Sequence, residues 1–154
     1  MRVGLVSDTH GPLDADVLEA LAGCQAVLHA GDIGDPGVLS LLARVGVVLA
    51  VRGNNDRTPP LSELPERHDV DLEGCRVHLV HRAADARPAA ETRVVVVGHS
   101  HAPLVDERDG RLWVNPGAAG RVGFHRRRWV ALLDCNGGVP HVQHIDLGPR
   151  RRQP

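Results

Sequence analysis

The sequence contains no lysine and no tyrosine, and it has one phenylalanine and two tryptophans among 154 residues. Aromatic residues make up 2% of the chain, so there are few rings on which nucleic-acid bases could stack. The 18 basic residues, all arginine, are balanced by 19 acidic ones, and the net charge is −1. A chain so close to neutral has no overall field that attracts nucleic acid or membrane surfaces. We therefore expect neither of them as a partner.

Long hydrophobic runs are also missing. No apolar stretch approaches the ~20 residues that a membrane helix needs. The apolar run that follows Met1 and Arg2 is too short for the core of a signal peptide. These two absences predict a cytoplasmic location.

Cysteine is scarce, with an odd number of widely spaced residues: Cys24, Cys75 and Cys135. None forms a CxxC pair, so the sequence predicts buried, reduced thiols and not a disulfide scaffold. A chain of this length buries roughly 68–70% of its unfolded surface and needs no covalent staple. We expect one domain over residues 1–148, followed by a flexible basic tail over 149–154.

Short apolar runs, each closed by polar residues, recur in the first third of the chain. Three have the length of buried strands, and the two segments between them have helical apolar spacing or a proline suited to a first helical turn. The expected strands are 2–7, 25–30 and 45–51, and the expected helices are 13–22 and 36–44. This order predicts a parallel βαβαβ unit.

The rest of the chain is richer in strands. A hairpin is expected around Gly74, a short helix is permitted over 83–91, and another strand is expected over 93–97. From Leu104 onward, strand-sized pieces are separated by turn residues. Together the two parts predict an α/β fold.

Aspartate, asparagine or histidine follows five of the expected strands. In chain order these residues are Asp8 with His10, Asp32, Asn54, His81, and His99 with His101. The carboxyl ends of strands in an open α/β sheet form the edge where ligands bind. We therefore expect residues that are far apart in sequence to meet in one crevice.

These side chains share the chemistry of metal binding. Imidazole nitrogens, carboxylates and an amide oxygen suit Mn²⁺, Fe²⁺ or Zn²⁺, and the absence of cysteine argues against a closed structural zinc site. Seven candidate ligands are too many for one ion and about right for two. Asp32, directly at a strand end, is the natural bridging carboxylate.

The ordered series DTH, GD, GNND, H and GHSH resembles the calcineurin-like metallophosphoesterases, in particular their small bacterial and archaeal phosphodiesterases. Asn115-Pro116-Gly117 is similar to a turn found downstream of the histidine pair in that family. The resemblance implies a two-sheet β-sandwich flanked by helices in four αββα layers. It also implies two ligand sets: Asp8, His10, Asp32 and His101 for one ion, and Asp32, Asn54, His81 and His99 for the other.

The resemblance implies hydrolysis of small phosphate esters by a metal-bridging hydroxide. We expect Mn²⁺ as the ion, with Fe²⁺, Zn²⁺ or Ni²⁺ as alternatives, and leave homo-oligomer formation open. A rival interpretation is a weak or inactive protein that acts as a scaffold, as the retromer subunit of this fold does. A nuclease is a third option, which the neutral charge disfavours.

Asn55 stands where many relatives carry a histidine that resembles a general acid. An amide cannot supply a proton, and a well-placed general acid is typically worth about 10²–10⁴-fold in rate. We therefore expect poor activity on alkyl monoesters and better activity on aryl esters or activated diesters.

Two further residues near these motifs have open interpretations. Asp56 is either a turn residue or a group that orients a ligand histidine. Arg82 replaces a glycine that is usual in relatives; it could clasp a second anionic group of the substrate, but we favour exposure to solvent or pairing with Asp85.

Other histidines and arginines have simpler interpretations. His29 lies inside a strand and is expected to be a core histidine. Five others are expected on the surface or on sheet faces: His68, His78, His125, His141 and His144. The arginine triplets at 126–128 and 150–152 are expected to be solvated.

Overall fold

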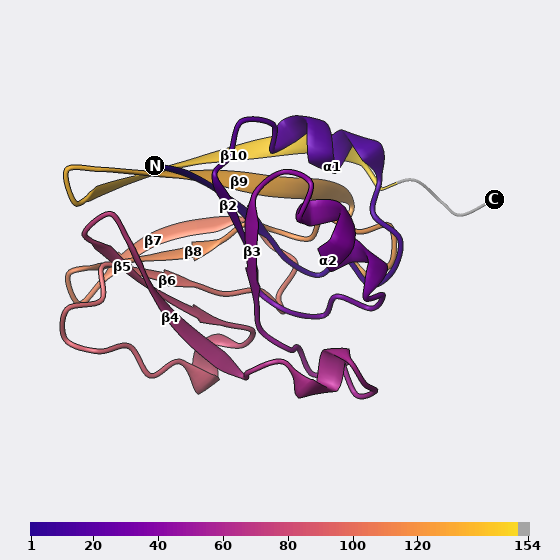
Figure 1. The fold of residues 1–154 in the computed structure, drawn as a ribbon, viewed down its shortest axis with the longest axis horizontal. Helices are drawn as coiled ribbons and strands as arrows, with labels where there is room; N and C mark the ends of the chain where they lie inside the picture. Colours follow the sequence, from indigo (N-terminus) through magenta and orange to yellow (C-terminus); the bar gives the residue numbers. More distant parts are fainter. Residues whose placement is uncertain (151–154) are drawn as a thin grey trace.

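The computed structural model describes residues 1–150, which form two five-stranded sheets and a few short helices. The first sheet has the order β10-β9-β1-β2-β3. Its strands are β1 (Arg2–Val6), β2 (Ala26–His29), β3 (Val47–Ala50), β9 (Arg127–Asn136) and β10 (Val139–Pro149). The strands β1, β2 and β3 are parallel, whereas β9 and β10 are antiparallel additions at one side (Figure 1).

The second sheet has the order β4-β5-β6-β8-β7. Its strands are β4 (Arg67–Leu72), β5 (Cys75–Val80), β6 (Val94–Val96), β7 (Leu104–Arg108) and β8 (Arg111–Asn115). The central strands β5, β6 and β8 are parallel, and hairpins add β4 and β7 at the two edges. The expected hairpin around Gly74 is the β4–β5 pair.

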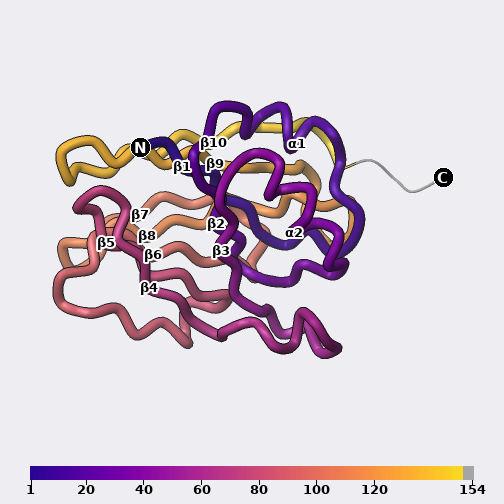
Figure 2. The backbone as a smooth tube through the Cα atoms, viewed as in Figure 1, coloured from indigo at the N-terminus to yellow at the C-terminus, as the bar shows by residue number. Residues whose placement is uncertain are grey.

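The two sheets pack face to face around a core of small and β-branched side chains. Val3 and Leu5 of the first sheet and Val77 and Val96 of the second are completely buried in this core. Alternation along each strand places these residues inward, which buries apolar surface worth about 25 cal/mol per Å². Figure 2 shows the two layers of backbone in the same view.

Both α-helices cover the outer face of the first sheet. They are α1 (Ala15–Ala20) and α2 (Gly37–Leu42), and each buries apolar side chains against the strands beneath. Val17 of α1 and Leu42 of α2 are fully buried there. The predicted α/β sandwich of two sheets is confirmed.

The outer face of the second sheet has no α-helix within the described chain, so the expected fourth layer is reduced to a short covering segment. The permitted helix over 83–91 is only the 3₁₀ turn η2 (Ala83–Asp85); a second 3₁₀ turn, η1 (Leu61–Glu63), precedes β4. Pro88 explains the short length, because proline lacks an N–H and disfavours helical backbone in the residue before it. Ala86 packs against the cluster of Val80, Val95 and Val97 on this face of the sheet.

The C-terminal boundary and one arginine differ from the sequence-based expectation. Strand β10 continues to Pro149, and the Arg150 N–H donates to the Arg126 carbonyl at 2.9 Å, so pairing passes the expected limit at 148. The remainder of the expected tail, 151–154, lies outside the described residues. Arg128 is fully buried instead of solvated, with its guanidinium 3.1 Å from Asp14 and 3.0 Å from Asp16. No helix among the described residues is long and apolar enough to cross a membrane.

Candidate metal centre

The seven predicted ligands lie at one edge of the sandwich, where parallel strands of both sheets end. Asp8 and His10 follow β1, Asp32 follows β2 and Asn54 follows β3. His81 directly follows β5, and His99 and His101 follow β6. The order of the five ligand-bearing motifs along the sequence is therefore the order in which the strands before them reach this edge.

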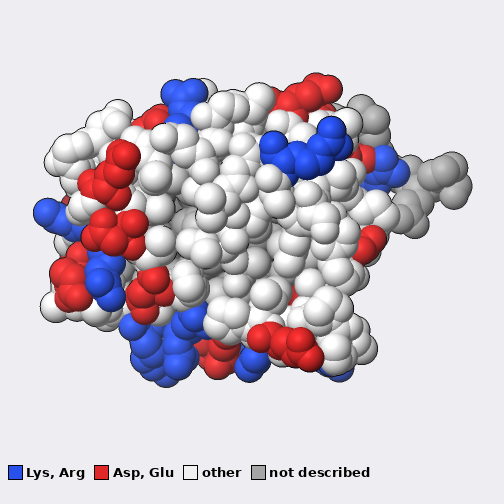
Figure 3. Space-filling model, in the orientation of Figure 1, with Lys and Arg blue, Asp and Glu red and all other residues white. Residues whose placement is uncertain are grey.

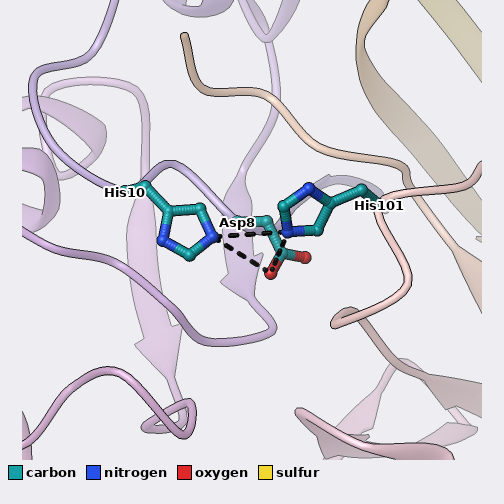
Figure 4. A group of neighbouring side chains, drawn as sticks. All are labelled: Asp8, His10 and His101. Carbon is teal, nitrogen blue, oxygen red and sulfur yellow. Dashed lines mark hydrogen bonds and ion pairs between the residues drawn. The ribbon is translucent and has the colours of Figure 1, made fainter. Parts of the chain in front are cut away.

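Asp8, His10 and His101 form one group of donor atoms (Figure 4). The His101 Nε2 lies 3.3 Å from both Asp8 Oδ1 and His10 Nε2, and the His10 Nε2 lies 3.7 Å from Asp8 Oδ1. Ligands bonded to one ion at about 2.0–2.2 Å lie roughly 3–3.6 Å apart, so this spacing suits a shared ion.

Asp32, His81 and His99 form a second group, with Asn54 beside it. The His81 Nε2 lies 3.4 Å from Asp32 Oδ2 and 2.9 Å from Asn54 Oδ1. Asp32 Oδ2 is also 3.7 Å from His10 Nε2 of the first group. One carboxylate therefore reaches donors of both groups.

The backbone at these positions is unusual. Seven non-glycine residues of the described chain have positive φ, and five of them are predicted ligands: Asp8, His10, Asp32, His99 and His101, with φ between 48° and 70°. Such conformations cost about 1–3 kcal/mol each and persist only where the surrounding structure enforces them. The other two, Glu73 and Asp109, lie in hairpin turns, where left-handed backbone is ordinary.

Two glycines allow the ligand loops to approach one another closely. A Cβ at Gly98 would clash with the Ser7 side chain and would lie 2.8 Å from Asp8 Oδ2. A Cβ at Gly53 would clash with the Asp32 carboxylate. Any larger residue at these two positions would therefore displace Ser7 or the Asp32 carboxylate.

The Asp8 carboxylate is buried with one oxygen satisfied and the other open. Asp8 Oδ2 accepts hydrogen bonds from the Ser7 hydroxyl at 2.6 Å and from the His99 N–H at 3.0 Å. Asp8 Oδ1 has no hydrogen-bond donor among the described residues and faces the two imidazoles. Burial raises the pKa of Asp8, but contacts with His101 and Ser7 outweigh burial and lower it. An ionised, open oxygen of this kind fits a metal ion.

The hydrogen bonds of His81 leave a nitrogen facing two acceptors. Its Nδ1–H donates to the Ala30 carbonyl at 2.7 Å, because a carbonyl can only accept. Its Nε2 faces the oxygens of Asn54 and Asp32, so this arrangement requires a cation, either a proton or a metal. Burial lowers the pKa of His81, but the neighbouring Asp32 outweighs it and raises the pKa. Burial similarly raises the pKa of Asp32, and contacts with His81 and Asn55 outweigh it, so that the pKa falls.

His125 is a site residue that the sequence analysis placed wrongly on the surface. It is buried, its Nε2–H donates to the Gly120 carbonyl at 2.8 Å, and its Nδ1 lies 3.0 Å from His101 Nδ1. Burial lowers the pKa of His125 and favours its neutral form, so its Nδ1 accepts the proton of His101 Nδ1. The His101 Nε2 lone pair is thereby directed at Asp8 and His10. No spacing signal marks His125, since it lies in an irregular segment 24 residues beyond His101.

Asp56 is a loop-organising residue and does not contact a ligand histidine. Its carboxylate accepts the backbone N–H groups of Ile33, Gly34 and Gly53 at 2.8–3.2 Å. It therefore ties the loop that carries Asp32 to the loop that carries Asn54. Of the two predicted alternatives, these contacts favour the turn residue.

His29 is a core histidine, as predicted. It is fully buried, accepts the Gly31 N–H at 3.1 Å, and lies 3.0 Å from the Thr9 hydroxyl. Among the other histidines assigned to surfaces or sheet faces, His78 is on β5 but buried, and its Nδ1 lies 2.9 Å from Asp69.

Asn55 and Arg82 make different contacts near the centre. The Asn55 side-chain amide donates to Asp32 Oδ2 at 2.9 Å, and its backbone N–H donates to Asp32 Oδ1 at 2.9 Å. Arg82 pairs with Asp85 at 3.1 Å, as the preferred interpretation predicted. Asn55 thus supports the carboxylate that is shared between the two groups.

Two clefts open beside the donor groups. One, of about 280 Å³, is lined by His10, Asp32, Asn54, Asn55, His99, His101, Val122, Gly123 and Phe124. The other, of about 380 Å³, adjoins Asn54 and His81 and contains three arginines, Arg52, Arg57 and Arg82. The first cleft has an apolar wall, whereas the second is lined by charged side chains of both signs, since Asp56, Glu66 and Asp85 accompany the three arginines.

Known proteins resemble this chain in sequence. Residues 1–138 match the model of the calcineurin-like phosphoesterase superfamily domain. A relative from Methanothermobacter thermautotrophicus, described as a probable metallophosphoesterase, is 31% identical over 135 residues, which span 77% of each chain.

Two solved structures share the fold. A novel archaeal phosphodiesterase has a TM-score of 0.78 and 22% identity, with 96% of this chain and 100% of that chain covered. Vps29 of Entamoeba histolytica, solved in complex with Zn²⁺, has a TM-score of 0.73 and 19% identity, with 95% and 99% covered. With the family model spanning most of its length, the chain belongs to the calcineurin-like phosphoesterase superfamily.

Proposed function

We propose that this protein is a dinuclear metal-dependent phosphodiesterase that acts on small esters with good leaving groups. The observation that carries the proposal is that two groups of donor atoms converge at one edge of the sandwich. Five of the residues in these two groups have left-handed backbone. Each of these backbone conformations costs free energy, and such conformations cluster at functional sites. Their concentration at this edge therefore indicates a binding site.

The proposed ligand sets follow the family resemblance. Asp8, His10 and His101 would hold one ion, His81, His99 and Asn54 would hold the other, and Asp32 would be shared between them. The position of Asp32 Oδ2, 3.7 Å from His10 Nε2 and 3.4 Å from His81 Nε2, supports the bridging role. The donors are imidazole nitrogens and oxygens without thiolate, which suits Mn²⁺ and also Fe²⁺, Zn²⁺ or Ni²⁺.

The chain's own residues orient this centre and bind the ester. Two divalent ions, when bound, activate water as the nucleophile and neutralise charge on the phosphoryl oxygens. His125 directs His101, the Ala30 carbonyl directs His81, and Asp56 holds the two ligand loops together. Asn55 presents an amide and therefore donates no proton to the departing oxygen. Leaving groups that are stable as anions are accordingly favoured.

The charge on the molecule supports a small substrate over a nucleic acid. Figure 3 shows acidic and basic residues mixed around the rim of one face, with an uncharged centre and no continuous basic track. A protein that follows a phosphate backbone instead gathers its arginines along one stripe.

The experiment that tests the proposal combines metal analysis with hydrolysis. The purified protein, loaded with Mn²⁺ and desalted, should retain about two ions per chain and hydrolyse bis(p-nitrophenyl) phosphate. His81→Ala should lose about one ion and at least a hundredfold in kcat/KM, whereas His141→Ala, which removes an exposed histidine on β10, should change neither quantity. Chelation should abolish hydrolysis, and added Mn²⁺ should restore it.

The Vps29 structures keep a scaffold as the second candidate. Fewer than about one tightly held ion, together with no Mn²⁺-stimulated hydrolysis, would favour the scaffold and contradict the phosphodiesterase. The presence of suitable residues at all seven ligand positions favours the enzyme.

A further inference from the structure

Phe124, the only phenylalanine of the chain, lies at the candidate metal centre with 75% of its surface exposed. Its ring stacks on the imidazole of His101, with 4.2 Å between centroids and 4° between planes. Val122, two residues earlier, is 45% exposed. Phenylalanine is usually buried, so an exposed ring held against a predicted ligand calls for an explanation.

The segment that carries Phe124 is pinned in place. The Arg150 guanidinium donates to the Gly123 carbonyl, and His125 donates to the Gly120 carbonyl at 2.8 Å. Gly123 has φ +139°, and a Cβ there would lie 2.7–2.9 Å from the rings of His101 and His125. The aromatic ring is therefore presented by a backbone that packs directly against the ligand histidine.

Phe124 and Val122 line the 280 Å³ cleft together with Asn55, His10 and other candidate ligands. This cleft is near the lower limit of ligand pockets, which span about 300–1,000 Å³, and suits one ring beside a phosphoryl group. The other exposed large apolar residues of the described chain lie on strands away from this cleft: Val47, Leu104, Val105 and Val139.

We propose that Phe124 and Val122 form a subsite for an aromatic ring attached to the leaving oxygen of the ester. The inference rests on the proposed phosphodiesterase function and names its substrate class as aryl phosphate esters. Offset stacking and edge contacts with Phe124 favour a planar ring over a saturated one.

Two neighbouring features assign the ring to the leaving group. Asn55 lines the same cleft, and its amide cannot protonate a departing oxygen. A phenol, with a pKa of about 10, leaves as an anion far more readily than an alkyl alcohol. The second cleft is lined by charged side chains, three of them basic and three acidic, and suits a polar group better than a ring. The cleft in which Asn55 stands at the position of the family's general acid is thus the one with the aromatic wall.

The test measures binding separately from hydrolysis. The Mn²⁺-loaded protein is titrated by calorimetry with phenylphosphonate, cyclohexylphosphonate and methylphosphonate, none of which is hydrolysed. We expect phenylphosphonate to bind about 3- to 10-fold more tightly than the other two. Phe124→Ala should reduce this ratio to about one, Phe124→Leu should retain part of it, and methylphosphonate binding should stay unchanged in both.

Val139→Ala provides the matched control, because it truncates a 55% exposed valine on β10 away from the cleft. Metal content is measured for every variant, since Phe124 contacts His101. If Phe124→Ala still binds phenylphosphonate more tightly than the other two ligands, the subsite is overturned. The exposed ring would then be assigned to contact with another protein. The subsite would also be overturned if the parent protein bound cyclohexylphosphonate as tightly as phenylphosphonate. The same holds if Phe124→Ala weakened the binding of all three phosphonates equally.

The outcomes separate this inference from the proposed function. If the preference for phenylphosphonate depends on Phe124 but the protein has no esterase activity, the proposed phosphodiesterase function is contradicted and the ring subsite is supported. If the protein hydrolyses the diester but shows no preference for phenylphosphonate, the ring subsite is contradicted and the phosphodiesterase function is supported.

Discussion

The Nδ1 of His125 lies 3.0 Å from the Nδ1 of His101, and the other nitrogen of His125 is fixed by the Gly120 carbonyl. This chain of two hydrogen bonds sets the tautomer of a predicted ligand from outside the metal centre. Partners of this kind typically contribute 10–100-fold to metal affinity.

His125→Ala should therefore weaken binding of one Mn²⁺ by about 10–100-fold while the second ion stays bound. Calorimetric metal titration measures both ions, and His141→Ala provides the control, as it removes an exposed histidine. Asn at position 125 retains an acceptor near His101 and should recover part of the loss. Unchanged affinity for both ions in His125→Ala would show that His101 does not need this partner.

Leaving-group preference is the second prediction. The parent protein should hydrolyse aryl esters much faster than alkyl esters, because Asn55 supplies no proton. Asn55→His should raise the alkyl rate by at least about tenfold, a part of the 10²–10⁴-fold that a well-placed acid contributes. Asn55→Ala removes the amide contact with Asp32 without adding an acid and should show no such gain. Roughly equal aryl and alkyl rates in the parent would refute this account of Asn55.

A third prediction concerns the buried arginine beneath α1. Arg128 pairs with Asp14 and Asp16, and its side chain is 1% exposed. Arg128→Met should lower the free energy of unfolding by about 1–3 kcal/mol, because both carboxylates lose a buried partner while Asp14 keeps its pair with Arg121. The exposed Arg126→Met should change it by less than about 0.5 kcal/mol. Urea unfolding of both variants measures the difference, and a similar small effect in both would exclude a structural role for Arg128.

The fourth prediction is a pH dependence of stability through His29, whose pKa burial lowers to about 4. An unfolded histidine titrates near 6.5, so between about pH 6.5 and pH 4 the unfolded chain binds a proton that the folded chain does not. Stability is therefore lost as the pH falls through this window, by about 2 kcal/mol at pH 5.

His29→Gln should remove this contribution. Urea unfolding at pH 7 and pH 5, in the presence of chelator, compares the parent with the variant. The parent should lose about 2 kcal/mol more than the variant over this interval. Identical pH dependence of the two proteins would show that His29 is not the group responsible.

The sequence was sufficient to place the candidate ligands because parallel strands bring their carboxyl ends to one edge. Asp8, Asp32 and His81 each follow a strand that is recognisable by its apolar residues. The two-sheet sandwich followed from the family resemblance. Helix boundaries were less accurate, and α1 and α2 are both shorter than the segments expected.

His125, Arg128 and Phe124 show what local pattern cannot predict. Arg128 occupies a position of β9 on the face that α1 covers, and the acids that bind it lie 112 and 114 residues earlier in the chain. His125 and Phe124 belong to a segment without periodic structure, so their direction depends on contacts with His101. These roles arise from tertiary packing, which a single strand or helix pattern does not contain.

The left-handed backbone at five candidate ligands has an evolutionary consequence. Glycine, asparagine and aspartate accept this conformation more readily than other residues do. Asp8 or Asp32 could therefore change to asparagine, and lose its charge, without forcing the chain onto a new path. The fold would then persist after the metal ligands are lost. A descendant protein could bind a protein partner in place of a substrate after very few mutations.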